Sequence, residues 1–176
     1  MSETKTVWHL WWGWNPEKVE NWIEEMEKEG WNLIKVDFNY MRFKFEKGES
    51  RKVRYCADYQ NNVEDNYFEL FKEYGWELVD NITTPWYIWR KSYKNERPNI
   101  YTDTKSLIER NNRLLKTMGI VLPTQFFMIY LALKNPSGKI ELTFGLFGLI
   151  MIIFFGYAIA QLYRNNKKLE KDGTTL

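Results

Sequence analysis

The sequence predicts an α+β head built from two βαββ units, followed by a linker helix and a transmembrane hairpin of two helices. Three observations favour this class: a stretch that occurs twice, strand and helix periodicities that recur in the same order around each copy, and an apolar segment near the C-terminus. Neither unit can cover its own apolar face. We therefore expect the tandem repeat to form one antiparallel sheet with two helices on one face.

The repeat joins residues 19–34, VENWIEEMEKEGWNLI, to residues 64–79, EDNYFELFKEYGWELV, with an offset of 45 and no gap. Gly30-Trp31 falls on Gly75-Trp76. In both copies a helical pattern runs up to the glycine, which adopts the left-handed conformation that ends a helix without steric cost. Each Gly-Trp pair therefore predicts a helix end followed by a strand.

In the first unit the alternation predicts a strand over 6–14, a helix that begins at Asn15-Pro16 and ends near Glu29, and strands over 31–38 and 40–46. We expect the first strand to bury Trp8, Leu10, Trp12 and Trp14, and to place Val7, His9 and Trp11 on its other face. The second unit repeats this order with strands over 51–60, 76–81 and 86–93 and a helix over 63–74.

Both predicted helices carry acidic residues at the positions between their apolar residues. We expect them on the solvent faces of the two helices, where charged side chains usually lie. They are Glu20, Glu24, Glu27, Glu69 and Glu73.

The expected organisation places the head over residues 1–100, with repeats at about 6–48 and 51–93, and a juxtamembrane linker helix over 101–116. The transmembrane hairpin follows over 117–163 and a basic tail over 164–176. Its two spans are residues 117–133, which cover about 26 Å as a helix, and residues 142–163. The alternative is a buried helical hairpin of a soluble protein, which an uncharged run of this length disfavours.

Basic residues predict the orientation. Four Lys or Arg residues precede the first span and four follow the second, whereas the connecting segment carries Lys134 and Lys139 with Glu141. We therefore expect a multi-pass protein of the cell membrane with both termini in the cytoplasm. The single cysteine, Cys56, and the lack of a signal-peptide pattern agree with a reducing compartment.

Charge and residue inventory disfavour two functions. Residues 1–100 hold 15 basic and 18 acidic residues, so the head lacks the basic excess of a protein that binds nucleic acid directly. One histidine and one cysteine cannot build a His/Cys metal site, and no Gly-rich phosphate loop or nucleophile motif is present. We expect no enzyme and no cofactor. A pair of His9 and Cys56 on neighbouring strands is conceivable, and two unrelated sheet residues are the alternative.

Aromatic residues suggest a binding surface, because all nine tryptophans lie in the head. The sheet face opposite the expected core mixes aromatic rings with charges of both signs, which suits a groove for a small ligand or a surface for a protein partner. Alternatively, the linker helix, the tail or a second copy covers this face. The candidate binding residues are His9, Trp11, Trp31, Arg42, Arg54, Tyr87 and Trp89.

Small and polar residues inside the spans are candidates for helix packing. Gly145, Gly148 and Gly156 lie in the second span, and Gln125 follows a proline in the first. They either seat the two spans of one molecule together or contact another subunit.

Three segments resemble a known family: the aromatic opening strand with its helix, the doubled Gly-Trp-x-Leu at 30–33 and 75–78, and Pro98-Asn99-Ile100-Tyr101-Thr102-Asp103. Over roughly residues 6–116 the chain resembles the bacterial domain of unknown function numbered 2812. The resemblance implies C-terminal membrane spans and a genetic neighbourhood with PadR-type transcriptional regulators, and it implies no activity. Duplicated βαββ units also build GyrI-like effector-binding domains, an analogy of fold alone.

Together these observations predict a membrane-anchored regulatory or sensor protein whose head binds a protein partner or a small ligand. A PadR-type regulator or a transporter would be a natural partner. The alternative is a structural subunit of a larger or homo-oligomeric membrane assembly.

Overall fold

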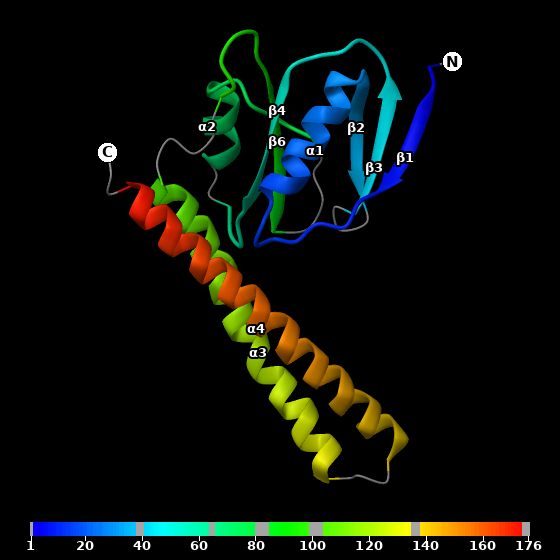
Figure 1. Ribbon diagram of the computed structural model, residues 1–176, viewed down its shortest axis with the longest axis vertical. Coiled ribbons are helices and arrows are strands. Elements are labelled where there is room, and N and C mark those ends of the chain that lie inside the picture. Colours follow the sequence, from blue (N-terminus) through cyan, green and yellow to red (C-terminus); the bar gives the residue numbers. More distant parts are fainter. Residues whose placement is uncertain are drawn as a thin grey trace. The chain divides into compact units, whose positions relative to one another are not determined.

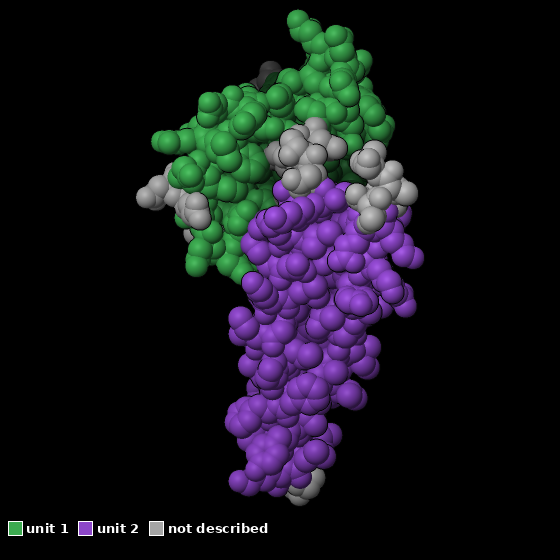
Figure 2. All heavy atoms as spheres, turned by 90° about the vertical axis from the view of Figure 1, so that its left-hand side faces the viewer, with its two compact units in different colours: residues 1–102 green, residues 103–176 purple. Residues whose placement is uncertain are grey.

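The computed structural model describes residues 2–37, 41–63, 66–79, 85–98, 104–134 and 138–173. The chain divides into two compact units, residues 1–102 and residues 103–176 (Figure 2). The first unit, the head, mixes strands and short helices, and the second consists of two long helices (Figure 1). The α+β class is thereby confirmed.

The first βαββ unit comprises β1 (Thr4–Trp8), α1 (Glu17–Lys28), β2 (Trp31–Asp37) and β3 (Arg42–Lys47). Its strands form a three-stranded antiparallel sheet in the order β1-β3-β2, here called sheet A. The second unit comprises β4 (Val53–Tyr59), α2 (Tyr67–Glu73), β5 (Glu77–Leu78) and β6 (Trp86–Ser92). Its strands form sheet B in the order β4-β6-β5.

The predicted repeat of element order is confirmed, but the strands form two sheets where one was expected. The predicted turn near Asn39 and the last two residues of the predicted strand 76–81 lie outside the described residues.

Both predicted helix stops are present. Gly30 has φ +79° and Gly75 has φ +74°, the left-handed region that favours glycine. At Gly30 a side chain would also meet the backbone, because a Cβ there would lie 2.7 Å from the carbonyl oxygen of Gly48. Each Gly-Trp pair therefore directs the chain from a helix into a strand.

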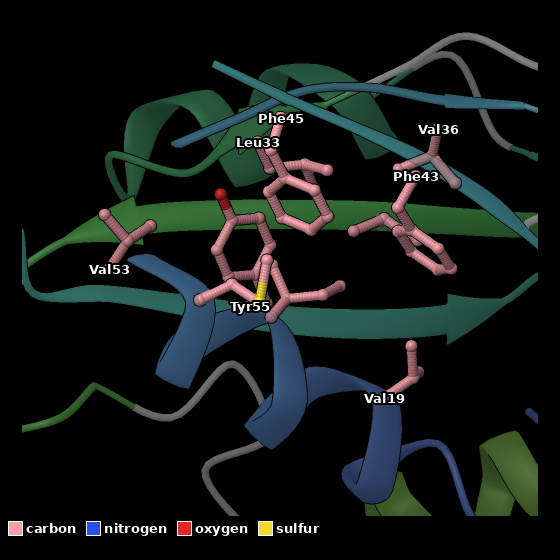
Figure 3. Close-up of a cluster of buried hydrophobic side chains, with 10 residues drawn as sticks. Val19, Leu33, Val36, Phe43, Phe45, Val53 and Tyr55 are labelled. Carbon is pink, nitrogen blue, oxygen red and sulfur yellow. The ribbon is translucent and has the colours of Figure 1, made fainter. Parts of the chain in front are cut away.

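The core of the head lies between α1, the inner face of sheet A and one face of sheet B (Figure 3). Leu33 and Phe45 pair across β2 and β3, as do Val36 and Phe43. All these side chains are buried, together with Val19 and Ile23 of α1 and Val53, Tyr55 and Ile88 of sheet B.

The first strand faces the opposite way from the prediction. β1 ends at Trp8, and a turn follows at residues 12–15, where the Asn15 amide donates to the carbonyl of Trp12 over 2.8 Å. Val7 pairs with the buried Phe43, so the face that carries Val7 points toward the core. Trp8, Leu10 and Trp12, which were expected inside, are exposed by 58%, 68% and 47%.

Three glutamates of α1 that were expected in solvent are buried instead: Glu20, Glu24 and Glu27. The reason is the edge of β4, which α1 covers. The Tyr55 amide donates to Glu24 Oε1 over 3.3 Å, and the Ala57 amide donates to Glu20 Oε1 over 2.9 Å. Helix carboxylates thus satisfy backbone donors that a neighbouring strand would otherwise bind.

Glu27 links α1 to both sheets through hydrogen bonds. Its carboxylate accepts hydrogen bonds from the Leu33 amide of β2 over 2.8 Å and from the Tyr55 hydroxyl of β4 over 2.6 Å. Arg51 supplies the compensating charge, with Nε 2.5 Å from Glu27 Oε2. Because Glu20 and Glu24 occupy the backbone edge of β4, sheet B stays separate from sheet A.

The two helices do not share one face of one sheet. α1 packs on sheet A and along β4, whereas α2 covers the face of sheet B that carries Cys56 and Trp89. Residues of α2 contribute their rings without being fully buried. β4 is enclosed on both faces and along one edge, which explains why every residue from Val53 to Tyr59 is buried.

The second unit is a helical hairpin of α3 (Thr104–Lys134) and α4 (Lys139–Gly173). Both helices are long and apolar enough to cross a membrane. α3 continues from the predicted linker helix through Pro123 to the end of the first span without a break. α4 likewise extends the second span through the predicted basic tail to Gly173.

Candidate interaction surface

The structure distributes the seven predicted binding residues over several environments, so the expected open face does not exist as one surface. Trp89 is fully buried beneath α2, where its ring stacks on Phe71 at 4.3 Å between centroids and its Nε1 donates to the Tyr67 hydroxyl over 3.0 Å. Tyr87 packs edge-on against Tyr67 and Phe68. The prediction that these two side chains line an open face is wrong, because α2 covers them.

Arg54 is also buried, in a second environment. Its Nη1 lies 2.9 Å from Glu20 Oε2 and 2.9 Å from Glu24 Oε1. The pKa of Glu24 reflects this pairing: burial raises it, but hydrogen bonds from Arg97 and Arg54 outweigh burial and hold it below its usual value. Arg54 therefore fastens β4 to α1 and is not a surface residue.

His9, Trp11 and Trp31 lie on the α1 side of sheet A. The His9 ring stacks on Trp22 at 4.1 Å, and burial lowers the pKa of the imidazole. Trp11 packs edge-on against Trp86 of sheet B at 4.9 Å. Trp31 carries the ammonium groups of Lys5 and Lys47 over its ring, at 4.0 and 4.6 Å.

The hypothetical pair of His9 and Cys56 is not assembled. His9 follows β1 of sheet A, whereas Cys56 lies in β4 of sheet B and packs with Trp76 and Trp89 in the cluster beneath α2. Among the described residues, no group of three or more His, Cys, Asp or Glu side chains could hold a metal ion.

Arg42 is the predicted binding residue that lies on the outer face of sheet A, opposite α1. Its guanidinium makes a bidentate contact with Asp37, with Nε 2.5 Å from Oδ1 and Nη2 2.8 Å from Oδ2. The contact raises the pKa of Arg42 and lowers the pKa of Asp37. The same guanidinium lies 5.7 Å from the ring centroid of Trp8.

From Trp8, which lies beside Arg42, exposed or half-buried apolar side chains continue along the chain at every second position, and they are here called the aromatic strip: Trp8, Leu10, Trp12 and Trp14. The Trp12 and Trp14 rings stack at 5.2 Å with an interplanar angle of 3°, and Trp14 is half-buried. Large apolar side chains that cluster on the surface of a soluble domain mark a site of interaction. Sequence reasoning assigned these residues to the core, because the first strand has large apolar residues on both faces.

The strip adjoins the edge of sheet A. β1 is an edge strand, and its odd-numbered residues bond to β3: the Lys47 amide donates to Glu3 and the His9 amide to Met41. Backbone groups alternate in direction along an antiparallel pair, so those of Thr4 and Thr6 point away from β3. This edge and the exposed side chain of Trp8 belong to the same strand.

Within the hairpin, two of the three predicted glycines lie against α3. A Cβ at Gly145 would overlap the Cβ of Ala132, and a Cβ at Gly148 would lie 3.0 Å from the carbonyl oxygen of Gln125. Gln125 itself is buried. Gly156 differs, because a Cβ there would meet nothing within 4 Å. Gly145 and Gly148 therefore allow close approach of the two helices, and Gly156 faces away from α3.

No curated protein and no solved structure matches the chain. One family model matches residues 15–122, more than half of the sequence, and takes in both Gly-Trp pairs and the Ile-Tyr-Thr-Asp segment. The chain therefore belongs to the family described as protein of unknown function (DUF2812).

Proposed function

We propose that this is a membrane-anchored regulatory protein whose cytoplasmic head binds a protein partner at the outer face of sheet A. The observation that carries the proposal is the exposure of Trp8, Leu10 and Trp12 on a folded domain. Tryptophan and arginine are the residue types that most often dominate the energy of protein interfaces. This chain presents both, with Arg42 beside Trp8.

The strip offers a large gain on burial. A tryptophan buries about 150–250 Å² in all, and Trp8 and Trp12 are 58% and 47% exposed. Covering the exposed half of each ring therefore gains about 2–3 kcal/mol before the entropy of association is subtracted. Binding loses little side-chain entropy at Trp12 and Trp14, because their rings are already stacked on each other in the head. A rigid aromatic surface of this kind suits a folded or extended polypeptide.

The edge of β1 determines the direction in which an extended partner segment would bind. A partner segment in extended conformation adds to β1 as a further strand and bonds to the backbone groups of Thr4 and Thr6 that point away from β3. Its side chains on the outer face then contact Trp8. Arg42, held in a fixed orientation by Asp37, is placed to bind an acceptor of the partner.

The hairpin supplies the anchor. α3 and α4 have the length and apolarity of membrane spans, and the distribution of Lys and Arg favours a head on the cytoplasmic side. A head held there concentrates its partner at the membrane. The family resemblance suggests a PadR-type regulator as the partner to test first, and a transporter is the other natural candidate.

Gly156 supports a second candidate function, a subunit of a homo-oligomeric membrane assembly. Gly156 and Ala160 lie four residues apart on α4, and both are exposed. Small residues at this spacing allow a helix of another subunit to approach closely. In this function the hairpin itself is the interface.

A photo-crosslinking amino acid at position 12 tests the first proposal in living cells, with position 74 as the matched control. Tyr74 is an exposed aromatic residue of the other βαββ unit, at the C-terminal end of α2. We expect position 12 to crosslink to a second polypeptide and position 74 to give no such product. Equal crosslinking from both positions, or none from position 12, would contradict the proposal.

A further inference from the structure

Basic side chains gather at one end of the helical hairpin, the end that follows the head in sequence. Six of them are exposed, and the four that lie nearest the apolar segments are here called the cationic collar: Lys116, Arg164, Lys167 and Lys168. Residues 104–116 and 164–171 together hold eight basic residues and two acidic ones, Glu109 and Glu170. The other end of the hairpin carries Lys134, Lys139 and Glu141.

Contacts between α3 and α4 fix the levels of these residues along the hairpin. Asn111 donates to Asn166 over 2.8 Å, and Asn166 donates to Asn112 over 2.9 Å. In this antiparallel register Lys116 lies near the level of Gln161, one helical turn from Arg164. The collar therefore begins where the apolar segments end, at Thr117 on α3 and Tyr163 on α4.

The collar points outward. Ala158, Leu162 and Asn166 form the buried stripe of α4 that faces α3, at a spacing of four residues. Arg164 and Lys168 lie about 200° around the helix from Leu162 and Asn166, on the outer side. The asparagine contacts hold the two helices together at this level, so the charges are presented by a rigid helix pair.

We propose that the cationic collar binds the headgroups of anionic phospholipids in the membrane leaflet that adjoins it. The group that the collar would bind is the phosphate diester of the headgroup, which lies at the boundary between the polar and apolar layers of the membrane. Arginine binds such a group through two parallel hydrogen bonds, and lysine adds charge. Basic residues next to a span are attracted to anionic lipids, and each contributes about a fivefold gain in binding.

The position of the collar along the hairpin and its positive charge distinguish this site from charge spread generally over the surface. The apolar length of α3, residues 117–133, is about 26 Å, shorter than a typical hydrocarbon core of about 30 Å. A short span draws the collar toward the headgroup layer, where its cations meet the lipid phosphates. The inference rests on the membrane insertion stated in the proposed function and does not involve the aromatic strip.

The experiment uses the full chain in detergent, with retained lipids counted by native mass spectrometry after addition of phosphatidylglycerol or phosphatidylcholine. We expect preferential retention of phosphatidylglycerol that weakens as salt rises. The K116Q/R164Q variant should bind it about 25-fold more weakly, because two charges are removed. K134Q/K139Q removes two charges at the other end of the hairpin and should leave retention unchanged.

Three results would overturn the inference: equal retention of both lipids, retention by K116Q/R164Q at the original level, or an equal loss in K134Q/K139Q. Inorganic phosphate is added in a separate arm. It should not displace the lipid at millimolar concentration, and displacement would assign the collar to soluble phosphate instead. The lipid-retention results are independent of crosslinking from position 12. If the membrane insertion stated in the proposed function failed, the chain would instead appear in the soluble fraction without detergent.

Discussion

The backbone amide of Tyr55 donates a hydrogen bond to the carboxylate of Glu24, so a helix side chain takes the place of a neighbouring strand at the edge of β4. The Ala57 amide is bound by Glu20 in the same way. Arg54 stands between the two carboxylates and compensates their charge. This arrangement separates the two sheets of the head.

Removing one carboxylate from this network should destabilise the head strongly. Glu24→Gln leaves the buried Arg54 paired with Glu20 and without Glu24, and loss of one member of a buried ion pair costs about 3 kcal/mol. The thermal unfolding temperature of the full chain, followed by tryptophan fluorescence, should fall. Glu25→Gln on the exposed side of α1 is the control and should change stability by about 0.5 kcal/mol or less. Equal effects would show that the network contributes little.

Acid should weaken the same network. Hydrogen bonds from Arg97 and Arg54 lower the pKa of Glu24 in the folded state. The stability that this carboxylate contributes is therefore complete above its unfolded pKa of about 4.3 and is lost as pH falls through the folded value. Unfolding temperature measured from pH 6 to pH 3 should decline more steeply in the native chain than in Glu24→Gln. Parallel curves would contradict the assignment.

His9 should add a separate pH dependence near neutrality. Burial against Trp22 lowers the pKa of its imidazole, so protonation favours the unfolded chain. Its contribution is complete above the unfolded pKa of about 6.5 and is lost as pH falls through the folded value. His9 is the only histidine of the sequence, so its ring signals in an NMR titration are unambiguous. A folded-state pKa above 6.5, or an unchanged stability profile in His9→Gln, would contradict this account.

Tryptophan substitutions should separate the core from the surface. Trp89→Ser removes a fully buried ring that stacks on Phe71, and the cost of such a truncation is about 3–5 kcal/mol. Trp8→Ser removes an exposed ring and should leave the unfolding temperature nearly unchanged. Circular dichroism melts of the two full-length variants provide the comparison. A large destabilisation by Trp8→Ser would mean that its ring is buried in the native protein.

Glycine substitutions should test the hairpin. Gly145→Val places a side chain against Ala132 and should push α3 and α4 apart, whereas Gly119→Val meets nothing within 4 Å and serves as the control. We expect a lower unfolding temperature in detergent for the first variant alone. Gly156→Leu should leave the packing of the hairpin intact, and a loss of oligomers in that variant would favour the homo-oligomeric assembly.

Local signals in the sequence were sufficient for the order of elements. The helix stops at Gly30 and Gly75 depend on backbone conformation at single residues, and the repeat places them in both units. The apolar length of α3 and α4 is likewise readable without tertiary contacts. These features do not depend on which segments meet in space.

Tertiary contacts determine which faces of the strands and helices are buried, and the sequence alone did not predict these. Periodicity separates the two faces of β1 but does not say which one is buried, because Val7 and Trp11 oppose Trp8 and Trp12 on a strand that is apolar on both sides. Glu20 and Glu24 look like a solvated helix face until the edge of β4 and Arg54 are placed beside them. His9 and Trp11 were misplaced for the same reason. Tyr87 and Trp89 were misplaced because both helices were expected on one face of one sheet, whereas α2 covers the face of sheet B that carries these two rings.

Hydrogen exchange of the head with and without its crosslinked partner is the most direct test of the proposed binding surface. The account predicts that the partner slows exchange at the Thr4 and Thr6 amides, which point away from β3, and leaves α2 unchanged. The variant with Trp8→Ser and Trp12→Ser should lose this protection while its unfolding temperature stays the same. Protection confined to other elements, with none in β1, would contradict the claim that the partner binds at this edge.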